Sequence, residues 1–220
     1  MSWLDAAWPL VRTHLPAAPA RVVDVGCGGQ GGFVPMLLAD GYDAVGVDPA
    51  APDEPRYVRA ELEHADLPGS RDAVVASLSL HHVADPAAAI DRIAELLEPG
   101  GTVVVLEWAS ERFDEASARW CFERLGPDEA PTWLHRRRDD WRASGKDWPR
   151  YLRDWAAEHG IHRGNEVVRL LDARLRRRLL EDGPYFFPDL ADTSEAEELA
   201  AIEAGRIQAA RITWVGEKRT

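Results

Sequence analysis

The feature that most constrains the fold is a regular alternation of strand-like and helix-like segments through residues 21–106. Short apolar runs, each followed by a turn, predict strands at 21–25, 43–47, 57–60, 73–78 and 102–106. The run 73–78 is apolar except at Ser77, as in a strand that is buried on both faces of its sheet. The alternation therefore predicts an α/β fold: a doubly wound, mostly parallel sheet with helices on both faces.

Helix signals lie between these strands. Pro35 suits the first turn of a helix at 33–39. The pair Asp85-Pro86 suits the start of a helix whose apolar residues then recur at helical spacing. The link between residue 48 and the third strand is short and rich in proline, so we expect at most a single helical turn there.

The C-terminal part completes the sheet. Residues 178–182 and 210–215 can add two antiparallel strands at its edge, with a helix at 195–204 between them. We thus expect one domain over residues 1–220, with a seven-stranded sheet and an amphipathic N-terminal helix within 1–15.

The stretch VVDVGCGGQGGF, residues 22–33, contains a G-x-G-x-x-G pattern, and Asp48 follows it. This spacing is typical of nicotinamide dinucleotide sites. However, Asp24 stands two residues before the first glycine, where its charge would oppose a pyrophosphate at the helix N-terminus. A ligand with a cationic amino group and a sulfonium fits this carboxylate better, and S-adenosyl-L-methionine has both. Its ribose hydroxyls also suit Asp48.

Further segments occur in order along the chain: VGVDP, ADLP, AVVASLSLHHVADP and LLEPGGTVVVLEW. Together with VVDVGCG, the chain resembles the class I S-adenosylmethionine-dependent methyltransferases, particularly the small-molecule type with Leu-His-His after the fourth strand. The resemblance covers residues 21–108 and implies the Rossmann-like methyltransferase fold. One departure is the turn itself, which is one residue longer than the usual G-x-G-x-G.

The resemblance also implies site residues. The methionine part of the donor would be held by Asp24 and by the turn residues Gly26, Cys27, Gly28, Gln30 and Gly31. Asp48 would hold the ribose, and Leu80 would also contact the donor. An acid after the third strand would meet the adenine edge. Glu61 and Glu63 are both candidates, and we favour Glu63 because it stands four residues before Leu67-Pro68.

Methyl transfer from a sulfonium requires alignment of the nucleophile and exclusion of water, and a general base is optional. Three residues at expected strand ends could deprotonate an acceptor: His81, His82 and Glu107. The alternative is that one histidine is a structural donor and the other lines a pocket. We expect Cys27 to contribute only its backbone. No histidine has partners at metal-ligand spacing, so we expect no metal site.

Residues 108–163 contain six tryptophans. We expect a tryptophan-rich helical insertion at 109–165, which either forms a lid over the substrate site or packs as an extra helical layer. Gly145 and Pro149 interrupt any continuous helix and could provide a hinge.

Composition limits the partners. The net charge of −12 disfavours binding to nucleic acid. No apolar run reaches the length of a membrane span, and the N-terminal residues do not resemble a signal peptide. Two cysteines favour a reducing, cytoplasmic location. We therefore expect a cytoplasmic methyltransferase with a small-molecule acceptor; the acceptor and the oligomeric state stay open. An NAD(P)-dependent oxidoreductase and a non-catalytic S-adenosylmethionine-binding protein are the alternatives.

Overall fold

A computed structural model describes residues 2–127, 129 and 131–219 of the chain. Its centre is one seven-stranded sheet in the order β3-β2-β1-β4-β5-β7-β6. Five neighbouring strands are parallel: β3 (Tyr57–Val58), β2 (Asp43–Val47), β1 (Arg21–Val25), β4 (Arg71–Ser77) and β5 (Leu97–Trp108). β7 (Arg211–Glu217) runs antiparallel to both β5 and β6 (Arg176–Gly183). The predicted fold class is confirmed.

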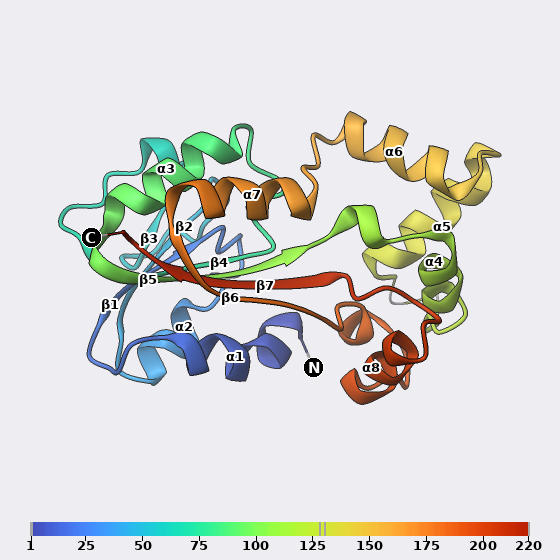
Figure 1. The fold of residues 1–220 in the computed structure, drawn as a ribbon, viewed down its shortest axis with the longest axis horizontal. Coiled ribbons are helices and arrows are strands. Elements are labelled where there is room, and N and C mark those ends of the chain that lie inside the picture. The colour runs from blue at the N-terminus through green and yellow to red at the C-terminus, as the bar shows by residue number, and fades with distance from the viewer. Residues whose placement is uncertain (1, 128, 130, 220) are drawn as a thin grey trace.

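Helices cover both faces of the sheet (Figure 1). On one face lie α1 (Trp3–His14) and α2 (Val34–Ala39), and on the other lie α3 (Pro86–Leu96) and α7 (Gly164–Arg174). The sequence analysis did not predict α7, which packs beside α3. The other helices gather at one end of the sheet: α4 (Glu115–Phe122), α5 (Trp133–Ser144), α6 (Trp148–Glu158) and α8 (Glu195–Glu203).

The two-sided burial of the sheet follows from the strand sequences. Along β1, Val23 and Val25 belong to the core beneath α3 and α7, while Val22 belongs to the core beneath α1 and α2. Strand side chains alternate between faces, so a strand with apolar residues at successive positions contributes to both cores. β4 shows the same alternation between Val74 and Val75.

Local signals set the helix boundaries. The Asp85 side chain accepts hydrogen bonds from the N–H groups of Ala87 and Ala88, which caps α3. Ser194 and Glu197 form a capping box at the start of α8. The link after Asp48 contains turns and no helix, as the prolines indicated.

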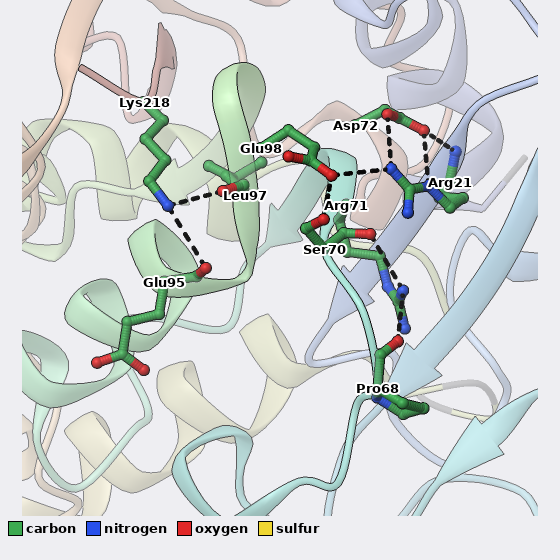
Figure 2. A network of polar contacts seen from close by, with 9 residues as sticks. All are labelled: Arg21, Pro68, Ser70, Arg71, Asp72, Glu95, Leu97, Glu98 and Lys218. Carbon is green, nitrogen blue, oxygen red and sulfur yellow. Dashed lines mark hydrogen bonds and ion pairs between the residues drawn. The ribbon is translucent and has the colours of Figure 1, made fainter. Parts of the chain in front are cut away.

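A charged network links the amino-terminal ends of β1, β4 and β5 (Figure 2). The Arg21 guanidinium bonds to Asp72 and to Glu98, and Ser70 also donates to Glu98. Beside it, Lys218 donates to the carbonyl of Leu97 at 2.7 Å. These contacts hold the amino-terminal ends of three neighbouring strands together.

Within the described residues, no helix combines the length and the apolar character that crossing a bilayer requires.

Candidate functional site

A cavity of about 250 Å³, which we call the crevice, lies at the carboxyl ends of the parallel strands. Five segments line it: Val25-Gly26 after β1, 47–49 after β2, 60–62 after β3, and 78–79 and 82–83 after β4. This is where open α/β sheets bind ligands. The volume lies just below the range of about 300–1,000 Å³ typical of ligand pockets, so the cavity suits one part of a larger ligand.

The glycine turn is shaped by close contacts. Gly26 has φ +76°, and a Cβ there would lie 2.2 Å from the Cβ of Ser79. Gly31 has φ +85°, and a Cβ there would lie 2.4 Å from the Tyr57 hydroxyl oxygen. Only glycine satisfies both conditions at these positions. The turn is therefore pressed against its neighbours, with Gly26 forming part of the cavity wall.

Asp24 lies beneath this turn and outside the cavity lining. Its side chain is 2% exposed and accepts a hydrogen bond from the N–H of Phe33 at 2.6 Å, just before α2. Burial raises the pKa of Asp24 to about 7, and the nearby charge of Asp48 adds to this effect. Asp24 thus anchors the turn and is a poorly solvated acid whose ionisation a nearby cation would favour.

Asp48 and Glu61 both line the cavity. One oxygen of Asp48 accepts a hydrogen bond from the N–H of Ala50 at 2.7 Å, which fixes the carboxylate at the end of β2. Glu61 precedes the short helix η1 (Leu62–His64), in which Leu62 points into the core. Glu63 lies within that helix and is not among the cavity residues. The cavity is therefore lined by Glu61 and not by the expected Glu63.

The remaining predicted donor contacts lie around the cavity without lining it. Leu80 is fully buried in the core beneath α3. Cys27 is buried, and the pKa of its thiol is raised to about 12, chiefly by burial, so the thiolate is not available. Gly28 has φ +62° in the turn, and Gln30 is exposed. Their roles in donor binding stay predictions.

Glu107, at the end of β5, is 1% exposed and holds the turn after β4 in place. One of its oxygens accepts the N–H groups of Ser79 at 3.1 Å and Leu80 at 2.7 Å. The other accepts the N–H of Trp108 at 3.2 Å and meets His81 Nδ1 at 2.5 Å. With these four partners, both carboxylate oxygens are satisfied by hydrogen bonds that hold the turn after β4.

The two adjacent histidines differ in exposure. His81 is 3% exposed and contacts Glu107, whereas His82 lines the cavity and is exposed to solvent. The two rings lie 4.0 Å apart. Partial desolvation by the cavity walls and the neighbouring His81 lower the pKa of His82 to about 4. A neutral imidazole therefore faces the crevice at neutral pH.

The sequence analysis missed a second buried carboxylate near this edge. Glu198 on α8 is fully buried and accepts the N–H groups of Tyr185, Phe186 and Phe187 at 2.7–2.9 Å. Burial raises its pKa. Tyr185 stacks on Trp108, with ring centroids 6.0 Å apart. No local motif marks Glu198, because its partners are more than ten residues away in sequence.

The tryptophans of 109–165 form a separate aromatic core. Trp148 is fully buried, and its indole N–H donates to the carbonyl of Phe113 at 2.6 Å. Trp133 donates to Asp189 at 2.9 Å. Trp155 lies against Trp108 on one side and beneath the Arg137 guanidinium on another. Whether this segment also moves as a lid stays a prediction.

Within the described part of the chain, three or more His, Cys, Asp or Glu side chains nowhere gather as they would around a metal ion.

Comparison with known proteins defines the class. A methyltransferase-domain family profile matches residues 4–182. The chain therefore belongs to this family of methyltransferase domains, and the resemblance to class I S-adenosylmethionine-dependent methyltransferases is confirmed.

Curated relatives match over part of their length. A ubiquinone biosynthesis O-methyltransferase of Xanthomonas euvesicatoria is 36% identical over 111 residues, which cover 41% of this chain and 44% of the relative. An uncharacterized methyltransferase of Mycobacterium bovis is 33% identical over 114 residues, covering 46% of this chain and 57% of the relative. The chain thus spans about half the length of the curated relatives it matches.

Solved structures show the same fold. An S-adenosylmethionine-dependent methyltransferase from Mesorhizobium loti has a TM-score of 0.56 at 24% identity, covering 97% of this chain and 99% of that one. The N-methyltransferase NodS from Bradyrhizobium japonicum, in complex with S-adenosyl-L-homocysteine, has a TM-score of 0.55 at 14% identity, covering 100% and 89%. The [4+2]-cyclase SpnF has a TM-score of 0.60 at 20% identity, covering 100% and 84%. The shared fold thus hosts more than one chemistry.

Proposed function

We propose that this protein binds S-adenosyl-L-methionine in the crevice and transfers the sulfonium methyl group to a small-molecule acceptor. The observation that carries the proposal is the convergence of Gly26, Asp48 and Glu61 on one cavity at the carboxyl edge of the sheet. The glycine allows close approach of the backbone, and the two acids provide acceptors for hydroxyl and amino groups.

Each residue has a proposed task. Asp48 receives the ribose hydroxyls through its carboxylate, which the Ala50 N–H already orients. Glu61 replaces Glu63 as the residue at the adenine edge, because Glu61 lines the cavity. Asp24 supports the turn beside the methionine part, where the cationic amino group favours the ionised form of this buried acid.

The bound donor supplies an activated methyl carbon, so the protein's task is to align a nucleophile and to receive its proton. Of the three candidate bases, His82 is the one that lines the cavity. Its lowered pKa keeps it unprotonated at pH 7 and also makes it a weaker base than an ordinary histidine. We propose His82 as the base that accepts the acceptor's proton. Glu107 and His81 are then positioning residues that hold the turn carrying His82.

The acceptor is a small molecule in this proposal, because the net charge of −12 disfavours nucleic acid. The O-methyltransferase names of the curated relatives favour a hydroxyl as the methylated group. We also propose a cytoplasmic location, consistent with two free, buried cysteines.

The test is ligand binding by the purified chain. We expect S-adenosyl-L-homocysteine to bind in titration calorimetry and to raise the melting temperature by mass action, while NADH does neither. If only NADH raised the melting temperature, the proposal would be wrong and the protein would instead be an NAD(P)-dependent oxidoreductase. Binding of S-adenosyl-L-homocysteine without methyl incorporation into any small molecule of a cell extract, supplied with labelled donor, would leave a non-catalytic binding protein.

A further inference from the structure

The structure contains a larger cavity that the proposed methyl transfer does not use. It has a volume of about 580 Å³ and lies between α6, the segment 110–114 after β5, and the residues 161–163 that lead into α7. Figure 1 shows α6 standing away from the sheet, with the chain returning from its end to α7. The volume falls within the range of pockets that bind small organic molecules.

The inner wall of this cavity is apolar. Phe113 and Trp148 are fully buried and form part of it, and Leu152, Ala156 and Ile161 are partly buried along its sides. Such a wall favours an aliphatic or aromatic body, because burying apolar surface contributes about 25 cal/mol per Å².

The charged side chains of the cavity differ in whether they already have hydrogen-bond partners within the protein. Glu111 accepts the N–H groups of Gly164 and Asn165 at 3.0 and 2.9 Å, which caps α7. Asp114 accepts the N–H of Ser117 at 2.8 Å and the side-chain amide of Gln208 at 2.7 Å. Both carboxylates are therefore committed to structural contacts.

The two cations of the cavity, Arg153 and Arg163, are exposed and uncommitted. Within the described residues, neither guanidinium makes a hydrogen bond or an ion pair. Asp154, the acid next to Arg153, is bonded instead to Lys146 at 2.8 Å. Arginine presents a planar fork of donors that matches the oxygens of a carboxylate.

We propose that this cavity is a second ligand site, for a small organic molecule with an apolar body and a terminal oxyanion such as a carboxylate. The apolar part lies against Phe113, Trp148 and Leu152, and the oxyanion meets Arg153 and Arg163. The site neighbours the crevice: between Ile161 and Arg163, the backbone N–H of His162 donates to the carbonyl of His81 at 3.0 Å. The inference does not depend on the identity of the methyl donor.

Octanoate and octanamide test the proposal, because they share a chain length and differ in charge. In amide NMR spectra of the 220-residue chain, octanoate should shift residues in 110–114 and 148–163 and bind more tightly than octanamide. The double variant Arg153→Gln/Arg163→Gln should weaken octanoate binding roughly three- to tenfold, as expected for two exposed charge contacts, and leave octanamide unchanged.

The matched control is Arg136→Gln/Arg169→Gln. It removes two exposed arginines that do not line the cavity and changes the net charge by the same amount. Octanoate affinity should stay at the wild-type value in this control. Equal affinities for octanoate and octanamide, equal weakening in both double variants, or shifts confined to other regions would overturn the proposal.

Discussion

The crevice and the aromatic core lie at the same end of the sheet but are built differently. The crevice is formed by short turns and a few polar side chains, such as Asp48 and His82, held by backbone hydrogen bonds. The aromatic core is formed by large rings packed against one another, such as Trp148 and Phe113, and the Trp148 indole N–H donates to the Phe113 carbonyl. Rare, large residues here contribute stability, while small and polar ones form the candidate site.

Two buried glutamates connect the regions. Glu107 holds the turn that carries His82, and Glu198 holds the segment that carries Tyr185. Each accepts several backbone N–H groups that would otherwise be buried without partners, which would be costly. The carboxylates thus stabilise irregular backbone beside the crevice.

The largest expected effect is in the aromatic core. Trp148→Ala should lower the free energy of unfolding by about 3–5 kcal/mol, because it removes a fully buried ring. Urea unfolding would measure this, and Trp141→Ala, at a partly exposed position, should cost less. The affinity of the folded variant for S-adenosyl-L-homocysteine should not change. If Trp148→Ala weakened S-adenosyl-L-homocysteine binding without lowering the free energy of unfolding, Trp148 would belong to the donor site. The proposed division between a stabilising aromatic core and a binding crevice would then be wrong.

The second prediction concerns Asp24, which lies beneath the glycine turn and should make the free energy of unfolding depend on pH. Burial raises its pKa from an ordinary value of 3.8 to about 7 in the folded chain, so between these pH values the folded state retains a proton that the unfolded state has lost. The stabilisation present below pH 3.8 is therefore lost as the pH rises through about 7. Relative to Asp24→Asn, the wild-type protein should lose about 3 kcal/mol between pH 4.5 and 7. A difference independent of pH would show that Asp24 is ionised throughout.

The third prediction concerns His82. His82→Ala should slow methyl incorporation about a hundredfold, at the lower end for loss of a general base, without changing the affinity for S-adenosyl-L-homocysteine. Because the pKa of His82 is about 4, the wild-type rate should be limited by its protonation only below about pH 5. The control is His64→Ala, an exposed position outside the cavity. If His82→Ala incorporated methyl groups at the wild-type rate, His82 would not be the general base.

The smallest effect is expected at Asp48. Asp48→Ala should weaken binding of S-adenosyl-L-homocysteine by one to two orders of magnitude, since hydrogen bonds to a charged group contribute about 1.5–3 kcal/mol. Asp48→Asn should lose less, because it keeps an oxygen for the Ala50 N–H. Asp53→Ala, in the exposed link that follows, serves as the control. Calorimetry giving the same affinity for Asp48→Ala and wild type would contradict the assignment.

Much of the fold could be read along the chain. The strands at 21–25 and 43–47 match β1 and β2, and the predicted helix at 195–204 matches α8 within one residue. These elements carry local signals: apolar runs, caps and terminating glycines. The helix α7 was not predicted, although Val167, Leu171 and Leu175 recur at helical spacing and form the face that packs beside α3.

The sequence by itself determined the class of fold and the position of the crevice, since strand alternation and the glycine turn are encoded by neighbouring residues. Only the tertiary structure decided which acid and which histidine face that crevice. Glu61 and Glu63 are two residues apart, and the turn of η1 separates their environments. Likewise, His81 is buried because Glu107, 26 residues away in sequence, binds its ring. Such choices depend on contacts between distant segments, which no local pattern contains.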